Sequence, residues 1–290
     1  MNNYSPIKNS VTPEDKFRFI YEIIDSQPWI NDFEEELIHL FTFCDSYDEQ
    51  MLLSHLLKEF FYLTDIKERE ACLALNGKIH EWKLSSTNTW IVAVANNHEV
   101  DGSSAGLQKL KNKIKPIEDW HNRFISNIPT AIDSIKEGEN VLLFDDFIGT
   151  GEKMLKKVNW IRRLLTKKGL DANKIKIYTA GFAGMRFGLE NFAKKSDCEI
   201  YAKHILLKGI SDKFPSSQVN SYIEIMLSLE NKLGEKYKNK KLSDYSLGFM
   251  RSETLYCGAN DNCPNNVFPI LWWPIIKDGS RHRTILTRAG

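Results

Sequence analysis

The sequence predicts an α/β protein: a parallel sheet with flanking helices, preceded by a helical segment at the amino-terminal end. One observation is a set of apolar runs of strand length, which indicate buried strands. Another is that stretches of helical length lie between these runs, so that strands and helices alternate from residue 90 to residue 207. Such alternation is typical of parallel sheets, because parallel strands need a crossover connection. The predicted strands are residues 90–95, 141–145, 176–182 and 199–207.

Helices are predicted both before the first strand and between the strands. The first helix begins at Pro13, with Thr12 before it as the N-cap residue. Apolar residues then recur at helical spacing in several further stretches. The predicted helices after the first are residues 30–43, 52–61, 66–82, 105–115, 120–135, 152–165, 185–193 and 217–233.

These elements suggest a division of the chain into two parts. We expect residues 1–85 to form a helical segment that caps the core or docks a partner. We expect residues 86–290 to form the core, with the C-terminal segment folded back on it because Trp272 and Trp273 are costly to expose. We expect both tryptophans to pack in a core.

Composition excludes several classes of protein. Apolar residues make up 42% of the 290 residues and aromatic residues 11%, so wholesale disorder is not expected. The formal net charge is only +1, which indicates no overall attraction to nucleic acid or membrane. The first ten residues have no apolar signal core, and no apolar run of 18 residues follows. The five cysteines are scattered and odd in number, so we expect a reduced, cytoplasmic protein without a membrane segment.

The stretch Val141–Lys153, VLLFDDFIGTGEK, organises the predicted site. A buried strand leads to two adjacent carboxylates, Asp145 and Asp146, and the small-residue loop Gly149–Gly151 then leads into a helix. The N–H groups of such a loop and of the first helical turn can cradle a phosphate, which the helix dipole also favours. The carboxylates can accept hydrogen bonds from ribose hydroxyls, directly or through a metal-bound water. The pattern therefore predicts a site for a polyol that carries a phosphate.

The same stretch has other interpretations. It could be an ordinary strand–loop–helix turn with a solvated acidic pair, although two adjacent acids at a buried strand end repel each other. The glycine loop of a Rossmann-like methyltransferase usually places its acid two positions before the first glycine, whereas Asp146 lies three before Gly149. A P-loop ATPase is poorly supported because G-x-x-x-x-G-K-[ST] does not occur.

The stretch resembles the 5-phosphoribosyl-1-pyrophosphate (PRPP) motif of type I phosphoribosyltransferases: a buried strand, two acidic residues and a Thr/Gly-rich loop. By position, Asp145 and Asp146 match the acidic pair that holds the ribose hydroxyls, and residues 149–153 match the phosphate loop. The resemblance implies a pentosyltransferase that uses PRPP with Mg²⁺ at these aspartates. One departure is Lys153, where the family usually has Thr or Ser. The loop residues carried over are Gly149, Thr150, Gly151, Glu152 and Lys153.

Two further segments could serve the same ligand. In phosphoribosyltransferases, the loop after an early strand binds the leaving pyrophosphate through backbone N–H groups. Asp101, Ser103 and Ser104 occupy that place in the chain, although an ordinary capped helix start explains them equally well. Arg186 follows a predicted strand at the sheet edge where ligands bind, and is a candidate for anionic substrate groups.

A narrower resemblance combines the motif with the C-terminal segment. Residues 264–273, PNNVFPILWW, together with the DDxxGTG loop look similar to a phosphoribosyltransferase-like effector family of bacterial conflict systems, such as retron-type antiphage cassettes. This resemblance implies a toxin-like defence effector restrained by partner proteins, such as a reverse transcriptase or a regulatory subunit, with associated nucleic acid. Asn265 and Asn266 are ligand-binding candidates, although turn formation also explains them.

The acceptor of the phosphoribosyl group is not readable from the sequence. A base, a nucleotide, a nucleic acid and a protein all stay open. Two other functions also remain: a non-catalytic PRPP or nucleotide sensor or scaffold, and an effector that cleaves a glycosidic bond with water as acceptor.

Overall fold

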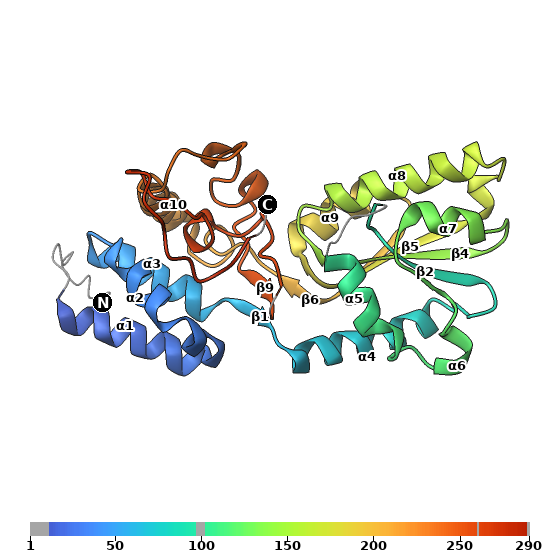
Figure 1. Cartoon of the computed structure of the whole chain (residues 1–290), viewed down its shortest axis with the longest axis horizontal. Coiled ribbons are helices and arrows are strands. Elements are labelled where there is room, and N and C mark those ends of the chain that lie inside the picture. Colours follow the sequence, from blue (N-terminus) through green and yellow to red (C-terminus); the bar gives the residue numbers. More distant parts are fainter. Residues whose placement is uncertain (1–11, 97–101, 260, 289–290) are drawn as a thin grey trace. The chain divides into compact units, whose positions relative to one another are not determined.

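The computed structural model describes residues 12–96, 102–259 and 261–288 (Figure 1). Contacts divide the chain into two compact units. Thr64–Leu207 forms one, here called the α/β unit, and Met1–Leu63 with Lys208–Gly290 forms the other, here called the composite unit.

The α/β unit contains a five-stranded sheet in the order β3-β2-β4-β5-β6. All four strand pairs are parallel, which confirms the predicted fold class. The sheet has the order 2-1-3-4-5 of a doubly wound fold when its strands are numbered along the chain. The strands are β2 (Thr89–Ala93), β3 (Phe124–Ile125), β4 (Asn140–Ile148), β5 (Lys176–Met185) and β6 (Glu199–Leu206).

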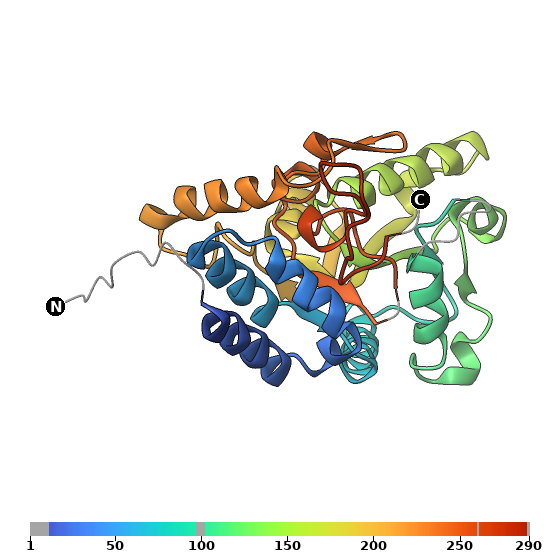
Figure 2. The same cartoon turned by 60° about the vertical axis from the view of Figure 1, so that its left-hand side comes forward.

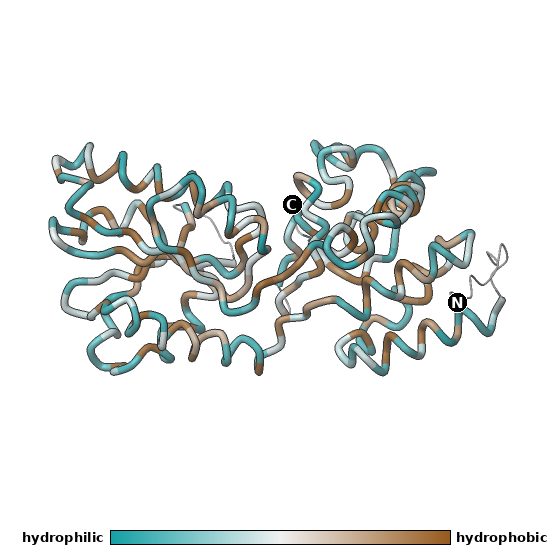
Figure 3. The backbone as a smooth tube through the Cα atoms, turned by 180° about the vertical axis from the view of Figure 1, so that it is seen from behind, coloured by the Kyte–Doolittle hydropathy of each residue, from teal (hydrophilic) through white to brown (hydrophobic). Residues whose placement is uncertain are grey.

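Helices cover both faces of this sheet (Figure 1). The face that carries Val141 and Leu143 packs against α7, α8 and α9. The opposite face carries Phe144, which contacts Gly106 of α5, and α4 packs against β5 and β6. Hydrophobic residues concentrate along the central strands, as expected for strands buried on both sides (Figure 3). The helices are α4 (Asp65–Glu81), α5 (Gly102–Lys111), α6 (Ile117–Trp120), α7 (Ile128–Ser134), α8 (Glu152–Lys167) and α9 (Arg186–Lys195), with the 3₁₀ turn η2 (Ala172–Lys174).

The composite unit joins the two ends of the chain around one core. Helices α1 and α3 pack together, and α3 contacts α10 (Figure 2). Strand β1 pairs with β9 in parallel, so that Phe61 lies opposite Tyr256. Trp272 and Trp273 are both buried in this core, which confirms that they are packing residues. The elements are α1 (Pro13–Ser26), η1 (Pro28–Phe33), α2 (Glu34–Thr42), α3 (Tyr47–Lys58), β1 (Phe61–Leu63), α10 (Ser216–Glu230), β7 (Lys236–Tyr237), β8 (Lys240–Lys241), η3 (Leu242–Asp244), η4 (Phe249–Arg251), β9 (Tyr256–Gly258) and η5 (Pro269–Leu271).

Side-chain caps explain where several helices begin. Thr12 accepts a hydrogen bond from the N–H of Asp15, and the Asp15 side chain in turn bonds the backbone N–H of Thr12, forming a capping box. Ser46 caps α3, Thr64 caps α4 and Asn127 caps α7 in the same way.

The structure differs from the sequence-based elements in three places. The helix predicted for residues 120–135 is wrong: α6, β3 and α7 occupy that stretch. Strand β4 does not end at Asp145 but continues to Ile148, because it keeps pairing with β5 as far as Gly184. The contacts also place 208–290 with the N-terminal helices, and α4 with the sheet, whereas the predicted division separated 1–85 from 86–290.

Across the described residues, no helix is both long enough and apolar enough to cross a membrane.

Candidate functional site

The candidate site lies at the topological switch point of the sheet, where the strand order reverses between β2 and β4. Pairing between β2 and β4 ends at Ala93 and Phe144, whereas pairing between β4 and β5 continues to Ile148 and Gly184. The last four residues of β4 therefore extend beyond the end of β2. Because β3 lies on one side of β2 and β4 on the other, this is the crevice in which doubly wound sheets bind ligands.

Asp145 lies in this projecting part of β4 and is buried, with 2% of its surface exposed. Its side chain is on the α8 face of the sheet. There the ammonium of Lys153, on α8, lies 3.2 Å from Oδ1 and 3.1 Å from Oδ2 of Asp145. Lys153 is about half exposed. The positive charge of Lys153 thus compensates a carboxylate that has lost most of its water.

Asp146 lies on the opposite face of the sheet, as the alternation of a strand requires. A Cβ atom at Gly102, the first residue of α5, would lie 2.5 Å from both carboxylate oxygens of Asp146. The carboxylate therefore sits against the bare backbone at the start of α5. The two aspartates are neighbours in the sequence, but their side chains do not converge from one side.

The loop Gly149–Gly151 packs backbone against backbone on α9. A Cβ atom at Gly188 would lie 1.9 Å from the carbonyl oxygen of Gly149. A Cβ atom at Gly151 would lie 2.3 Å from the carbonyl oxygen of Gly188, and Gly151 has a φ of +77°. Both glycines are needed for this close approach, and Gly151 also for its left-handed backbone.

Asn191 of α9 holds the same loop by hydrogen bonds. Its amide Nδ2 donates to the Thr150 carbonyl and to Oε1 of Glu152, each at 3.0 Å. Glu152 also forms an ion pair of 2.7 Å with Lys195. The hydrogen bonds from Lys195 and Asn191 lower the pKa of Glu152. The Glu152 side chain is therefore directed to α9, and only its backbone is placed to meet a ligand.

The first turn of α8 lacks the usual side-chain cap. Gly151 occupies the N-cap position, and the Glu152 N–H makes only a long bond of 3.4 Å to Oγ1 of Thr150. The first regular helical bond runs from the Leu155 N–H to the Gly151 carbonyl at 3.0 Å. A helix start of this kind can accept an anion such as a phosphate, because no N-cap side chain covers it and the positive end of the helix dipole lies there.

The other predicted site residues that the structure describes in the α/β unit lie near the starts of α5 and α9. Ser103 is fully buried near the start of α5, next to Gly102. The hydroxyl of Ser104 donates to the Ser126 carbonyl at 3.1 Å, which ties α5 to the segment before α7. Arg186 is exposed at the start of α9, directly after β5. Asp101 lies outside the described residues.

Asn265 and Asn266 belong to the composite unit. The carbonyl of Asn265 accepts a hydrogen bond from the Phe249 N–H at 2.9 Å. The carbonyl of Asn266 accepts from the Ser252 hydroxyl at 2.8 Å, and the Asn266 side chain donates to the same hydroxyl at 3.2 Å. These bonds give both asparagines a role in holding the turn that precedes β9.

The donor set fits a divalent cation only in part. Among the described residues, no group of three or more His, Cys, Asp or Glu side chains could hold a metal ion. The carboxylate oxygens of Asp145 and Asp146 have the chemistry that Mg²⁺ prefers, but Lys153 lies close to both oxygens of Asp145. The described side chains alone therefore do not complete the oxygen shell that Mg²⁺ needs.

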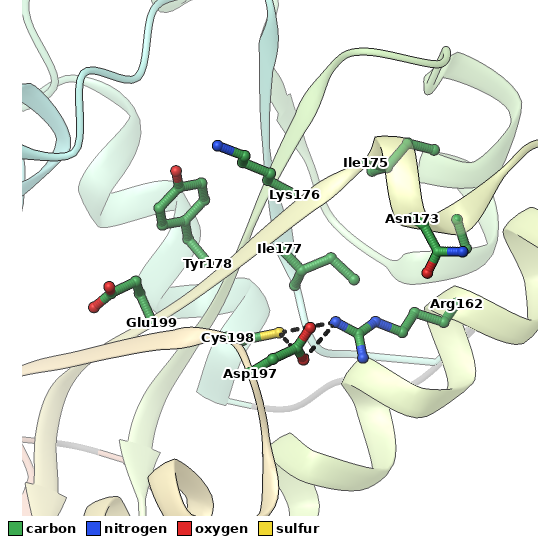
Figure 4. A pocket seen from close by; sticks show the side chains of 10 residues that line it. Arg162, Asn173, Ile175, Lys176, Ile177, Tyr178, Asp197, Cys198 and Glu199 are labelled. Carbon is green, nitrogen blue, oxygen red and sulfur yellow. Dashed lines mark hydrogen bonds and ion pairs between the residues drawn. The ribbon is translucent and has the colours of Figure 1, made fainter.

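A separate polar pocket of about 370 Å³ lies at the other end of β5 and β6 (Figure 4). There Arg162 of α8 forms an ion pair of 2.7 Å with Asp197, and its guanidinium lies 3.5 Å from Sγ of Cys198. Burial raises the pKa of the Cys198 thiol, so this cysteine lacks the thiolate character of a nucleophile. Arg162 and Asp197 already pair with each other.

The sequence predicts the aspartates and the loop as site residues but gives no indication of Gly188 and Asn191, which hold that loop on α9. Neither belongs to a recognisable motif. Both lie in a predicted helix whose inward face could be assigned only from its packing on α8.

Comparisons with known proteins agree with this architecture. No curated protein matches the chain. The sequence profile of one family, PRTase-CE, matches residues 27–285, which span both units and include all of β4, the glycine loop and the C-terminal tryptophans. On the strength of that match and of the parallel sheet, the chain belongs to the PRTase-CE family and is a phosphoribosyltransferase-like protein.

Proposed function

We propose that the site at the end of β4 binds the 5-phosphoribosyl group of PRPP, together with Mg²⁺, and transfers this group to an acceptor. One observation carries the proposal. Two carboxylates in the projecting part of β4 lead directly into a glycine loop and an α-helix start that has no side-chain cap. A sugar phosphate needs this combination of acceptors for its hydroxyls and donors for its phosphate.

The roles of the residues follow from their positions. The backbone N–H groups around Thr150 and Gly151 and the start of α8 would hold the 5-phosphate. Asp146, half-buried against Gly102, would accept hydrogen bonds from the ribose hydroxyls. Asn191 would act indirectly, as a positioning residue that keeps the loop on α9.

The chemistry of the transfer would depend on electrostatics more than on a nucleophile. Breaking the bond between the anomeric carbon and pyrophosphate leaves positive charge on the ribose ring, and the electron pair departs with pyrophosphate. A carboxylate near the ring stabilises that charge, and an oriented ribose lowers the entropic barrier. A bound Mg²⁺ would supply charge neutralisation at the departing pyrophosphate.

The ion pair between Lys153 and Asp145 supports a second candidate function, a PRPP or nucleotide sensor without turnover. Lys153 lies within 3.2 Å of both carboxylate oxygens of Asp145. This contact leaves less negative charge to stabilise a cationic ribose ring. A protein that only binds the sugar phosphate would not need that charge.

One experiment separates the two functions. Purified protein is incubated with PRPP and Mg²⁺, with and without candidate acceptors, and pyrophosphate release and PRPP binding are both followed. Release by the wild type that is lost in the double variant Asp145→Asn, Asp146→Asn supports transfer, and release without any acceptor indicates that water is the acceptor. Binding without release supports the sensor. Binding that is unchanged in the double variant would contradict both.

We further propose that the protein is an effector of bacterial antiphage defence, restrained by partner proteins. The similarity of the DDxxGTG loop and residues 264–273 to effectors of conflict systems supports this proposal. Expression of the chain alone should arrest growth, and the same double variant should relieve the arrest. Equal arrest by both proteins would contradict an effector role for this site.

A further inference from the structure

The composite unit contains a pocket of about 710 Å³ that the proposed transfer does not use. It lies between the region around the start of α2 and the C-terminal segment, and its walls carry three arginines, two threonines, two glutamates and one histidine. We propose that this pocket binds a small phosphorylated sugar, with its phosphate on the arginines and its hydroxyls on the glutamates and the histidine. The residues that carry the argument are Arg281, Arg283, Arg288, His282, Glu35 and Glu36.

The three arginines differ in how far the protein already occupies their guanidinium donors, since Nη1 of Arg288 donates to the Cys263 carbonyl. The Arg281 side chain is exposed and makes no ion pair or hydrogen bond within the described residues. Arg283 pairs with Glu35 at 2.8 Å, but the two side chains are 57% and 79% exposed, so a ligand can replace this weak contact. Arg288 lies over the Trp272 ring, and its Nε is buried without an acceptor. Guanidinium forks match the geometry of phosphate oxygens.

The Nε2 atom of His282 is a hydrogen-bond acceptor to which no group of the described residues donates. Its Nδ1 lies 2.8 Å from the Trp273 carbonyl, and since a carbonyl can only accept, Nδ1 carries the proton. Its Nε2 therefore holds a lone pair, and this atom is buried without a hydrogen-bond partner. Burial lowers the pKa of His282 to about 4, so that the ring is neutral near pH 7. A buried polar atom left unsatisfied is uncommon, and under this proposal a ligand hydroxyl supplies the donor that Nε2 lacks.

The mixture of charges favours a sugar phosphate over a nucleic acid. Glu35 and Glu36 line the same pocket as the three arginines. Their carboxylates would repel a continuous phosphate backbone, whereas sugar hydroxyls can donate to them. The volume of about 710 Å³ lies within the usual range of small-ligand pockets. A compact molecule with one phosphate and several hydroxyls satisfies all three kinds of group.

The test uses ribose 5-phosphate as the probe and reads individual arginines. Intact protein is treated with phenylglyoxal, which modifies accessible guanidinium groups, with and without the probe, and the modified residues are identified by mass spectrometry. Ribose 5-phosphate should protect Arg281 and Arg283 but not the exposed Arg251. Calorimetry should show that Arg281→Ala weakens binding of the probe to this pocket by about tenfold.

Two variants serve as controls. Lys277→Ala removes one exposed positive charge from the same segment, outside the pocket, and should bind the probe like the wild type. The double variant Asp145→Asn, Asp146→Asn disables the α/β site and should leave the protection of Arg281 and Arg283 unchanged. Failure of PRPP transfer therefore does not affect this test.

Three results would overturn the inference. One is the absence of protection at Arg281 and Arg283 at probe concentrations that saturate any binding seen by calorimetry. Another is equal weakening by Lys277→Ala and Arg281→Ala, which would indicate a non-specific charge effect. The third is protection by a single-stranded oligonucleotide but not by ribose 5-phosphate, which would identify the surface as a nucleic-acid contact.

Discussion

Lys153 gives the candidate site a positive charge at a position where a small hydroxyl residue is usual in the PRPP motif. Its ammonium contacts both oxygens of Asp145, which is 2% exposed. A buried carboxylate without such a partner would be costly. The sequence revealed the lysine but not its contact, because seven residues, including the glycine loop, separate it from Asp145 and only the packing of α8 on β4 brings the two together. We therefore propose that Asp146, rather than Asp145, accepts most of the hydrogen bonds from the ribose hydroxyls.

Gly102→Ala tests the position of Asp146. The new Cβ atom would lie 2.5 Å from both carboxylate oxygens, so the carboxylate must rotate away. Because the far end of a side chain can move, we expect the melting temperature to change little. Calorimetry should show PRPP binding weakened by about tenfold or more, the usual cost of losing a hydrogen bond to a charged group. Unchanged affinity in a folded variant would mean that Asp146 does not contact the ligand.

Glu230 predicts a pH-dependent stability in the composite unit. This residue is 2% exposed and accepts hydrogen bonds from the Ser246 hydroxyl at 2.6 Å and the Leu247 N–H at 3.0 Å. Burial outweighs these bonds and raises the pKa of Glu230 to about 7. The folded state then retains a proton that the unfolded state has lost, so the stability linked to Glu230 falls as the pH rises from about 4.5 through 7. His282, whose pKa is lowered to about 4, acts in the opposite direction below pH 6.5.

Comparison with Glu230→Gln isolates this effect, since both proteins keep His282. Relative to the wild type, the variant should gain unfolding free energy between pH 5 and pH 8, by up to about 3 kcal/mol. Urea denaturation at both pH values measures the difference. A constant difference between the two proteins would show that Glu230 has an ordinary pKa.

At the scale of elements, the sequence predicts those features of helices and strands that depend only on residues close together in the chain. The cap at Thr12 and the apolar run of β4 were both readable. The extension of β4 to Ile148 was not, because Asp145 and Asp146 disfavour strands and pairing with β5 overrides that preference. Strand β3 has only two residues, too few to show a period, and the cap of α7 at Asn127 was not predicted either.

The packing of the glycine loop on α9 gives the element-scale prediction. In Gly188→Ala the new Cβ atom would lie 1.9 Å from the Gly149 carbonyl, which is backbone and cannot rotate away. We expect α9 to shift away from the loop, which should lower the free energy of unfolding by about 1–3 kcal/mol. The same shift should weaken PRPP binding. Gly77→Ala is the matched control, because its Cβ atom on α4 meets nothing within 4 Å. That variant should gain about 0.5–1 kcal/mol, and equal effects of the two substitutions in urea denaturation would contradict the packing.

At the scale of the whole molecule, the division into units could not be predicted from local pattern. The composite unit depends on contacts between residues far apart in the chain, such as the pairing of Phe61 with Tyr256 and the ion pair of 3.1 Å between Lys232 and Glu49. Periodicity describes each helix but not its partner. The predicted burial of Trp272 and Trp273 is confirmed. Only the fold shows that the N-terminal helices form part of the core in which they are buried.

The most direct test of the central claim is an NMR titration of the isotopically labelled full chain with PRPP and Mg²⁺, following backbone amides. The account predicts that the amide signals of Thr150 and Gly151 shift and saturate together, and that the shifts are lost in the Asp145→Asn, Asp146→Asn variant. Shifts confined to other parts of the chain, or shifts at the loop that persist in the variant, would contradict a phosphoribosyl site at the end of β4.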